Sequence, residues 1–553
     1  MYRYEWCYRK LKIWLLSIES KDTRKIGGLA EVPPRIGEEL VKRGHEVYLI
    51  TINNGFIVGN GDFKQIFKTV KKGVEYKAYL YDKPIVKHIV FTGGSLDEKE
   101  VYSPKILPAK VMEWSMVMKE LIEKSLGSND IPDIIHGNDW HSYPPLLAAK
   151  AILDNRGVKT KYFYHIHLVS NSTLDLDLFY EYTGIDPSTK INGIFGSKSL
   201  REYYDESRGG YIERLAALTV DKVITVSRNY VINVVRKIGL DLESKVDYVY
   251  NAITWSLEKL INEARMFNPD LSSFLSIEKI FSIERRILRG ELLTKLRERI
   301  GYCTEIDDEE SKKYVHSLTI YPFEGCGIVD SFENDGPLMI MTGRIAKQKG
   351  IDILINATDL IVSELPELKI LLTPLPVWSE RGEIESLVEF SIMFRDNVRV
   401  VFGKAPSIYA LMHLSANGLL APSIHEPFGL MALEAMVSGT PVVASKTGGL
   451  AETVLDIREK GVLGTGLHVK PGNWRDLAIN TVDLAVFMET QYLEPWSSVW
   501  KDYIDRLHSS ELRKILLSNP NAPELVRKSC LNRALVFNWS SSVNRLLSIY
   551  SGG

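Results

Sequence analysis

The sequence lacks several features that would place it in other classes of protein. Its four cysteines, Cys7, Cys303, Cys326 and Cys530, are scattered over 553 residues and form no metal-type pair. We therefore expect free thiols in a reduced, cytoplasmic protein. No apolar run approaches the roughly 20 residues of a membrane-spanning helix, so we expect no membrane partner. The 68 basic and 70 acidic residues provide no basic excess, so we expect no nucleic-acid partner.

The composition that remains is that of a globular protein, with 45% hydrophobic and 25% charged residues. The chain is too long for one ordinary core, which predicts two large domains. Basic residues before Ile13–Ile18 resemble a signal peptide, but the apolar run is short and ends at Glu19, so we predict a buried strand. Strand and helix patterns then alternate along the chain. This order predicts an α/β protein with parallel sheets.

The segment Ser423–Ser445 is predicted to form a loop, a helix, a stop and a strand. Pro427 suits the first turn of the helix, and Gly439 is a plausible stop. Glu426 and Glu434 lie eight positions apart, a helical rise of roughly 12 Å that is about the span from hexose to ribose. A helix N-terminus between them suits a diphosphate. The hypothesis is a grip on a sugar nucleotide; the alternative is a buried helix with two solvated acids.

Loops at the carboxyl ends of parallel strands are where such sheets bind ligands. Lys25–Leu29 contains paired glycines that suit an anion, although it lacks the spacing of a dinucleotide fold or a P-loop. His136–His141 is polar and aromatic, as sugar-contacting loops are. The alternatives are a surface turn and an ordinary strand-end loop.

Two further segments carry ionisable groups. His165 and His167 share one face of a strand and, with His136 and His141, could bind zinc, or hydrogen-bond a sugar hydroxyl instead. In the loop Thr342–Gly350, Arg344 and Lys349 stand beside glycines at a strand end. Two cations there suit a diphosphate leaving group, and the alternative is a basic surface loop.

These loops, in this order, resemble the glycogen and starch synthases, which are retaining GT-B glycosyltransferases. Lys25–Val32 is similar to their KxGGL signature, and His136–His141 is similar to their HxxDWH loop. Thr342–Gly350 is similar to GRxxxQKG, and Glu426–Glu434 matches the E-x7-E element of many relatives. Asn251 stands where the family has an Asn-Gly-Ile turn. The resemblance covers most of residues 11–485.

The resemblance implies an α/β protein of the GT-B fold, in which two Rossmann-like domains face a deep interdomain cleft. We expect residues 1–254 to form the acceptor domain and 336–525 the nucleotide-sugar domain. Residues 255–335 are expected to be a helical insertion and connector. A C-terminal helix within 526–553 is expected to return to the first domain.

The implied activity is that of a glycogen or starch synthase. Such an enzyme transfers glucose from ADP-glucose or UDP-glucose to the non-reducing end of an α-1,4-glucan, with retention and without a metal or cofactor. The alternatives are a sucrose- or trehalose-forming enzyme with a small acceptor, a non-catalytic sugar-nucleotide or glucan binder, and a zinc enzyme. The sequence chooses neither between ADP and UDP nor between a monomer and a homo-oligomer.

The resemblance also assigns roles to individual residues. Arg344 and Lys349 would neutralise the departing diphosphate, Glu426 would bind the donor glucose and Glu434 the ribose. The remaining expected site residues are Asp139 as the acidic cleft residue, His167 orienting the donor sugar, Lys25, Gly27 and Gly28 at the phosphates, Asn251 in its turn, and Phe428, Gly429 and Leu430 through backbone N–H groups. The sequence departs from the family at Thr254 and Asn417, where an acid is common. The segment His165–Thr173 also lacks the Asn that usually follows the histidine.

Overall fold

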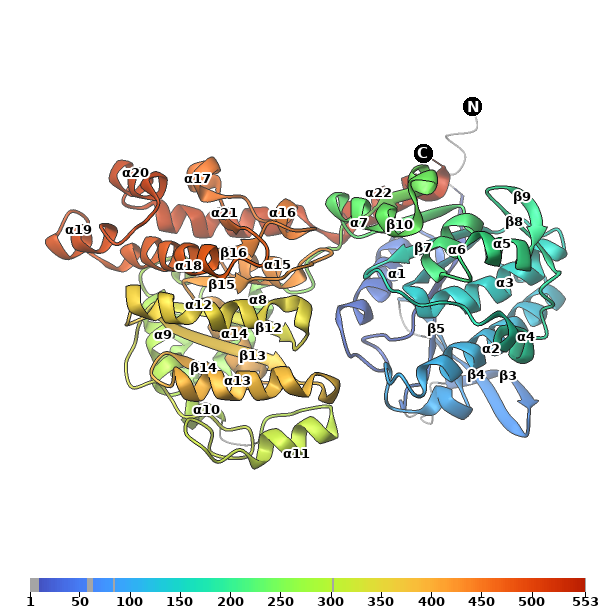
Figure 1. The fold of residues 1–553 in the computed structure, drawn as a ribbon, viewed down its shortest axis with the longest axis horizontal. Coiled ribbons are helices and arrows are strands. Elements are labelled where there is room, and N and C mark those ends of the chain that lie inside the picture. Colours follow the sequence, from blue (N-terminus) through green and yellow to red (C-terminus); the bar gives the residue numbers. More distant parts are fainter. Residues whose placement is uncertain (1–8, 57–62, 83–84, 301–302, 553) are drawn as a thin grey trace. The chain divides into compact units, whose positions relative to one another are not determined.

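The computed structural model describes residues 9–56, 63–82, 85–300 and 303–552 (Figure 1). The chain divides into two compact units. The first comprises Met1–Asn251 with Asn538–Gly553, and the second is Ala252–Phe537. Each unit has its own sheet, mixed in the first unit and parallel in the second, and we describe each unit by itself.

In the described residues, the first unit contains a nine-stranded sheet of order β11-β10-β7-β6-β1-β2-β5-β4-β3. Its strands are β1 (Lys12–Leu16), β2 (Glu46–Ile52), β3 (Phe63–Lys71), β4 (Val74–Asp82), β5 (Lys87–Thr92), β6 (Ile134–Asn138), β7 (Lys161–Ile166), β10 (Lys222–Thr225) and β11 (Val246–Tyr248). The β3–β4 and β4–β5 pairs are antiparallel and the others parallel. The parallel part thus has the strand order of a doubly wound α/β fold.

The predicted strand Ile13–Ile18 overlaps the central strand β1 over Ile13–Leu16, whereas Ser17 and Ile18 lie beyond its end. Ile13 pairs with Val47 on one side and with Ile134 on the other, so β1 is enclosed by parallel neighbours. Helix α1 (Val32–Lys42) begins with Pro33 near its first position, where the missing N–H costs nothing. Helices α2 (Leu107–Gly127) and α3 (Tyr143–Asn155) pack against each other.

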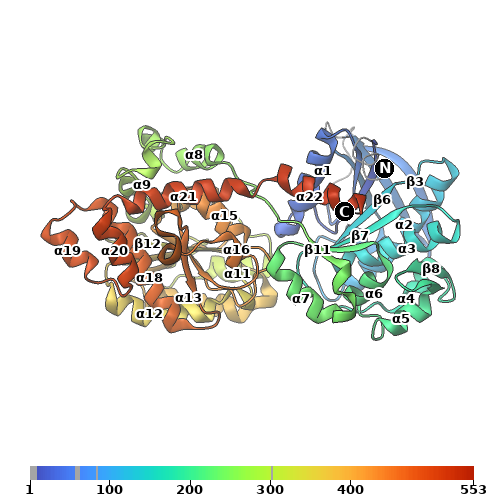
Figure 2. The ribbon, with the colours of Figure 1, turned by 90° about the horizontal axis from the view of Figure 1, so that it is seen from above.

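The last helix of the chain, α22 (Trp539–Ser551), belongs to the first unit. It lies beside α1 (Figure 2). Its apolar residues Val543, Leu546, Ile549 and Tyr550 join a buried cluster with residues of β1 and α1. Residues from both ends of the chain therefore pack together in the core of the first unit.

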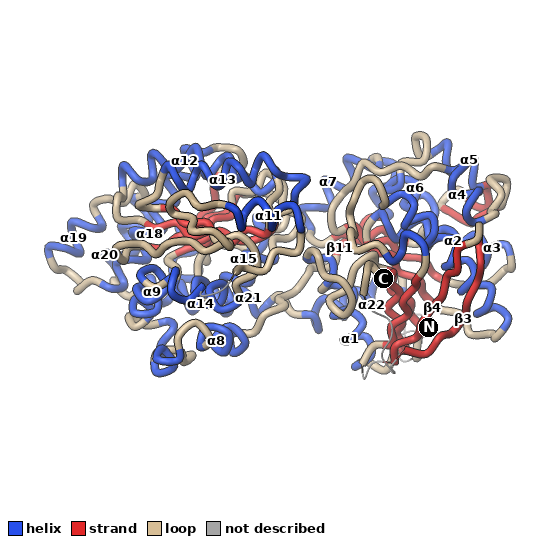
Figure 3. The backbone as a smooth tube through the Cα atoms, turned by 90° about the horizontal axis from the view of Figure 1, so that it is seen from below, coloured by secondary structure: helices blue, strands red, loops and turns tan. Residues whose placement is uncertain are grey.

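The second unit contains, among its described residues, a six-stranded parallel sheet of order β14-β13-β12-β15-β16-β17. The strands are β12 (Leu338–Arg344), β13 (Lys369–Leu375), β14 (Val398–Val400), β15 (Gly418–Ala421), β16 (Val442–Ser445) and β17 (Gly466–Val469). Helices α12 (Ile351–Glu364) and α13 (Arg381–Met393) cover one face, and α8 (Leu257–Arg265), α9 (Arg285–Thr294) and α14 (Pro406–Ser415) the other (Figure 3). Helix α15 (Leu430–Val437) packs against α21 (Ala522–Val536).

The segment 255–335 is built into this second unit. Helices α8 and α9 both pack on α14. Arg285 of α9 is buried and donates to the carbonyl oxygens of His413 and Ser438, each at 2.8 Å. Arg289, also buried, pairs with Glu489, with 3.0 Å between Nη2 and Oε1. Whether the segment is an insertion relative to the family stays a prediction.

The expectation of free cysteines is wrong for two of them. Cys303 and Cys326 are joined by a disulfide, with 4.7 Å between their Cα atoms. The sequence hides this pairing because 23 positions separate the two residues. Cys530 is a free, buried thiol, and Cys7 lies outside the described residues.

No helix in the described part of the chain is long and apolar enough to cross a membrane.

Candidate functional site

Strand order places the expected ligand loops at the switch point of each sheet. In the second unit β12 neighbours β15, and the loops that leave these two strands carry Arg344 and Glu426. In the first unit β1 neighbours β6, and the loops that leave them carry Gly27 and Asp139. Doubly wound sheets bind ligands at this position, because neighbouring connections there diverge to opposite faces and leave a crevice.

The loop after β12 presents two cations. Arg344 is the last residue of the strand and its side chain is exposed. Lys349 follows in a short turn, and Gly350, with φ +72°, then caps α12. A side chain at Gly350 would place its Cβ 2.3 Å from the carbonyl oxygen of Pro422, so only glycine fits this close approach.

Glu426 lies against this basic loop. Its Oε2 is 2.5 Å from Nζ of Lys349, and both side chains are largely buried. The backbone ties the two loops together, since Ile424 N–H donates to the carbonyl oxygen of Gln348 at 2.9 Å. The carboxylate thus holds Lys349 in place, while Arg344 remains exposed beside the pair.

Helix α15 begins at Leu430, later than its pattern predicts. Gly429 is its N-cap, with φ +89°, so Pro427 lies in the preceding loop rather than in the first turn. Phe428 is buried and stacks edge-on with Phe537, at 5.7 Å between ring centroids. The loop therefore delivers the helix N-terminus, the positive end of the helix dipole, to the carboxyl edge of the sheet.

Glu434, one turn into α15, is held by two hydroxyls. Tyr409 of α14 donates to its Oε2 at 2.8 Å, and Thr254 donates to its Oε1 at 3.4 Å. Trp255 lies against the Tyr409 ring, with 5.1 Å between centroids. The departure from the family at Thr254 thus has a local role in this chain.

In the first unit, the Lys25–Leu29 loop is organised by Glu19. The buried Glu19 carboxylate accepts the backbone N–H groups of Ile26 at 2.6 Å and Gly27 at 3.0 Å. It also accepts the hydroxyl of Tyr102 at 2.6 Å. Lys25 pairs with Glu31 at 2.7 Å, and Gly28 opens a short 3-10 turn. Sequence reasoning missed Glu19, because an acid directly after a strand looks like a solvated end.

Asp139 stands in a constrained position after β6. Its φ of +58° is unusual for a residue other than glycine. Its Oδ1 accepts the backbone N–H groups of His167 at 2.7 Å and Leu168 at 3.2 Å. Burial raises the pKa of Asp139 to about 8, although these two bonds act in the opposite direction. Asp139 therefore connects the ends of β6 and β7.

The expected histidine cluster has two different environments. His165 is fully buried, whereas His167 is partly exposed at the end of β7, so a ligand can reach only His167 of the two. Their rings stack at 4.3 Å, and Nε2 of His167 bonds Oδ1 of Asn138 at 3.0 Å. Burial lowers the pKa of His167 to about 3, so its ring is neutral. His136 is buried with its Nδ1 on the hydroxyl of Tyr550, at 2.6 Å.

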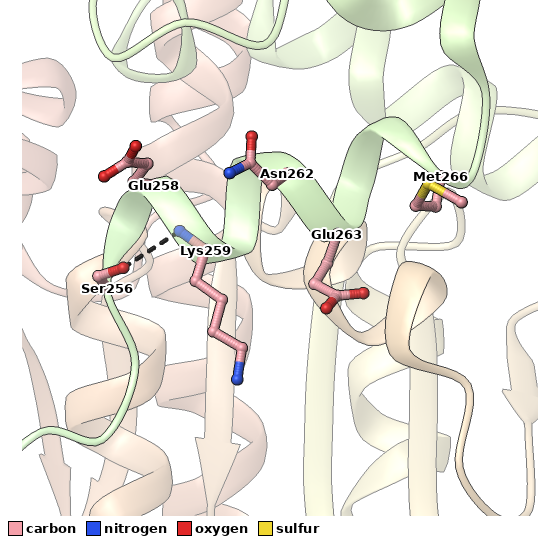
Figure 4. A pocket seen from close by; sticks show the side chains of 6 residues that line it. All are labelled: Ser256, Glu258, Lys259, Asn262, Glu263 and Met266. Carbon is pink, nitrogen blue, oxygen red and sulfur yellow. Dashed lines mark hydrogen bonds between the residues drawn. The ribbon is translucent and has the colours of Figure 1, made fainter. Parts of the chain in front are cut away.

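Other positions are less direct. Asn251 is buried at the point where the chain leaves the first unit. Asn417 is also buried, where its Oδ1 accepts from Leu338 N–H and from Arg289, each at 3.0 Å, so it stabilises the core. A surface pocket along α8 is lined by Ser256, Glu258, Lys259, Asn262, Glu263 and Met266 (Figure 4). None of the expected site residues lines it.

The sequence is similar to those of known glycosyltransferases. The family described as starch synthase catalytic domain matches residues 12–246, and glycosyl transferases group 1 matches residues 329–482. Glycogen synthase 2 of Geobacter metallireducens is 26% identical over 475 residues, covering 82% of this chain and 87% of that protein. A glycogen synthase of a Hydrogenobaculum species is 22% identical and covers 98% of each chain.

Solved structures agree on the fold. The catalytic domain of starch synthase IV from Arabidopsis thaliana, bound to ADP and acarbose, has a TM-score of 0.61 at 15% identity, covering 94% of this chain and 100% of that one. Sucrose-phosphate synthase from Thermosynechococcus elongatus has a TM-score of 0.52 at 19% identity, covering 98% of each chain. The chain is therefore a glycosyltransferase with the GT-B fold, and its first unit matches the starch synthase catalytic domain family.

Proposed function

We propose that this protein is a glycogen or starch synthase that transfers glucose from a nucleotide-glucose donor to an α-1,4-glucan, with retention. The observation that carries the proposal is the group of Arg344, Lys349 and Glu426 at the switch point of the second sheet. Two cations and one carboxylate at that edge suit a sugar diphosphate, whose charged and hydroxylated ends need different partners.

The donor is assigned to the second unit. Arg344 and Lys349 bind the diphosphate, together with the backbone N–H groups of Phe428, Gly429 and Leu430. Glu426 accepts hydroxyls of the donor glucose, and Glu434 accepts those of the ribose. The hydrogen bond from Tyr409 supports the assignment of Glu434 to the ribose. It fixes Oε2 of the Glu434 carboxylate and thereby sets the direction of the whole carboxylate group. The base contacts then fall near Tyr409 and Trp255.

The chemistry follows from charge. As the bond between C1 of glucose and the phosphate oxygen breaks, the sugar becomes oxocarbenium-like and the diphosphate gains negative charge. Fixed cations at Arg344 and Lys349 stabilise that charge, a contribution that is usually large in enzymes. The acceptor hydroxyl forms the new bond to C1 on the same face, and its proton passes to the departing phosphate oxygen. This step needs no separate acid–base carboxylate pair and no divalent cation.

The acceptor is assigned to the first unit, and His167 and Asp139 complete the reaction site. His167, neutral and partly exposed, suits a hydrogen bond to the donor sugar. Asp139 positions His167 through the backbone bond between them. Lys25, Gly27, Gly28 and Asn251 bind substrate. Since Gly27 N–H is bonded to Glu19, its contact with phosphate requires that this loop rearrange.

The rest of the proposal concerns partners and place. The substrates are a nucleotide sugar and an α-glucan, without a cofactor, in the cytoplasm. ADP-glucose and UDP-glucose are both chemically compatible with the loops after β12 and β15. Homo-oligomerisation and primer preference are not assigned.

The test is transfer of labelled glucose by the purified protein. ADP-glucose and UDP-glucose are each incubated with glycogen, and separately with fructose 6-phosphate, glucose 6-phosphate and free sugars, with and without a chelator. We expect label in glycogen, released by an enzyme that cleaves α-1,4 bonds, with the chelator having no effect. Comparison of the two donors identifies the nucleotide.

Other outcomes identify the alternatives. Label confined to a small product contradicts the glucan assignment and supports a sucrose- or trehalose-forming enzyme. Binding of donor or glucan without transfer identifies a binding protein. Loss of activity in chelator, with recovery on adding zinc, identifies a zinc enzyme. A protein with both Arg344→Ala and Lys349→Ala controls for contaminating transferase.

A further inference from the structure

A second cluster of chemically active side chains lies in the loop segment before β12. Cys303 and Cys326 meet there, and His316 approaches them from the last turn of α11 (Glu309–Ser317). One ligand atom from each of the three lies within 4.8 Å of the other two. A disulfide needs only the two cysteines. The presence of a histidine next to both of them instead suggests a site with three ligands.

Backbone hydrogen bonds hold the three residues together without using sulfur. Cys326 N–H donates to the carbonyl oxygen of His316 at 2.9 Å, and Thr304 N–H donates to that of Cys326 at 3.2 Å. Cys303 is exposed, while His316 and Cys326 are half-buried. The three groups therefore stay close, and open to an ion from solvent, when the sulfur–sulfur bond is absent.

The imidazole of His316 uses one ring nitrogen for a backbone hydrogen bond. Its Nε2 lies 3.1 Å from the carbonyl oxygen of Thr304, so a neutral ring donates this N–H and keeps a lone pair on Nδ1. Histidine ligands commonly donate their other ring N–H to a backbone carbonyl, which fixes the tautomer and the ring orientation. Two thiolates and one imidazole form a ligand set that suits Zn²⁺.

We propose that the reduced Cys303 and Cys326, together with His316, form a Zn²⁺ site. The metal and the disulfide exclude each other, because both use the same two sulfur atoms. A dithiol supplies the two electrons and two protons that open the disulfide, and it is itself oxidised to a disulfide. Binding of Zn²⁺ then releases the two thiol protons, because the metal takes thiolates. Water fills the fourth tetrahedral position. This site is separate from the transfer reaction, which the proposed mechanism runs without metal.

Its position gives the metal a structural role. Between Cys303 and α11, Glu305 forms a bridge with Lys404, whose N–H donates to the Glu305 carbonyl oxygen at 2.8 Å. Lys404 Nζ also bonds Asp307 at 2.9 Å. Lys404 precedes α14, the helix that carries Tyr409. The site thus fixes a loop that abuts the start of this helix.

Cobalt substitution tests the proposal directly. The full-length protein, carrying Cys7→Ser and Cys530→Ser to remove the other thiols, is reduced with a phosphine, freed of reductant without oxygen, and titrated with Co²⁺. We expect one equivalent to produce thiolate-to-cobalt charge-transfer and tetrahedral d–d absorption, which Zn²⁺ abolishes. Zn²⁺ is also expected to raise the thermal midpoint of the reduced protein and to protect both thiols from alkylation.

Variants assign the ligands. Cys303→Ser and Cys326→Ser are expected to abolish the charge-transfer band, and His316→Ala to weaken cobalt binding at least about tenfold. His316→Cys is expected to restore binding with a stronger band, and His508→Ala serves as the control histidine. Circular dichroism confirms that each variant folds. The proposal is overturned if the reduced protein gives no band, if the band survives both cysteine variants, or if the folded disulfide resists reduction.

Discussion

At the scale of single residues, the candidate donor site depends on which charges are already satisfied. Lys349 is paired with Glu426 before any ligand arrives, whereas Arg344 is exposed. A diphosphate would therefore meet Arg344 directly and would share Lys349 with the carboxylate. Both cations can act on the leaving group, but Lys349 carries the additional task of holding Glu426.

Removing either cation tests this arrangement. We expect Arg344→Ala and Lys349→Ala each to lose more than about 3 kcal/mol of transition-state stabilisation, because each removes a fixed charge at the leaving group. Steady-state kcat/KM for glucan transfer measures the loss. Lys347→Ala is the matched control, since Lys347 is an exposed lysine of the same loop. Near-normal turnover in both variants contradicts the proposed role.

The buried Asp139 predicts a pH effect on stability. Its folded-state pKa is raised from 3.8 to about 8, chiefly by burial, so the folded protein holds a proton that the unfolded chain has lost. This contribution is complete below the unfolded pKa and disappears as pH rises through about 8. Asp139→Asn removes it. Between about pH 5 and about pH 8.5, the free energy of unfolding of the wild type should fall relative to that of the variant. We expect this difference to exceed about 1.4 kcal/mol.

Hydrogen exchange in β6 and β7 during urea unfolding measures this difference within the first unit. Asp177→Asn is the control, because the Asp177 side chain is 93% exposed. Parallel stability profiles for wild type and Asp139→Asn would show that the carboxyl keeps an ordinary pKa.

At the scale of elements, local pattern predicts most of the sheet but not every boundary. Runs of consecutive apolar residues predict β1, β2 and β16, because such a run indicates a buried strand from local sequence alone. The start of α15 is displaced from Pro427 to Leu430, since Gly429 takes a left-handed conformation that ends the loop there. Glu19 escapes prediction because its partners, Gly27 and Tyr102, are distant in sequence.

The arginines of α9 make a testable claim about the segment 255–335. Arg285→Leu leaves the carbonyl oxygens of His413, Ala416 and Ser438 without this donor. The oxygens of His413 and Ala416 keep donors from Thr440 and Arg527, so the cost falls mainly on the Ser438 oxygen. A buried acceptor that loses its donor costs about 1–3 kcal/mol, so we expect a loss of at least about 1 kcal/mol. Thermal and urea unfolding measure the loss. Arg286→Leu is the control, because Arg286 is 53% exposed. Equal stability of the two variants would mean that the segment 255–335 is not part of the stabilising core of the second unit.

At the scale of the whole molecule, the two units are interleaved in sequence. The chain leaves the first unit after Asn251 and returns to it at Asn538. The two ends of the second unit lie side by side, since Ile253 N–H donates to the carbonyl oxygen of Phe537 at 3.1 Å. Helix α22 then fills the core beside β1 and α1.

This interleaving predicts how fragments behave. Residues 1–251 alone are expected to be insoluble or unfolded, because they leave the core that α22 covers exposed to water. The same residues joined to 538–553 through a short Gly-Ser linker are expected to fold, as circular dichroism and a cooperative thermal transition would show. The matched control fuses the same helix with Leu546→Asp and Ile549→Asp. A stable, cooperative 1–251 fragment contradicts the prediction.

Local sequence patterns predict the alternation of strands and helices, the resemblance to the glycogen and starch synthases, and the loops that carry Arg344, Lys349, Glu426 and Asp139. These are local properties, because periodicity, glycine positions and motif spacing act within a few residues. The resemblance implies that a C-terminal helix returns to the first domain, but the residues of β1 and α1 on which α22 packs emerge only in the folded chain. The same is true of the meeting of Cys303 with Cys326 and of the burial of His165 beside an accessible His167. Each of these depends on contacts between residues far apart in the chain or on depth within a sheet, which no local pattern encodes.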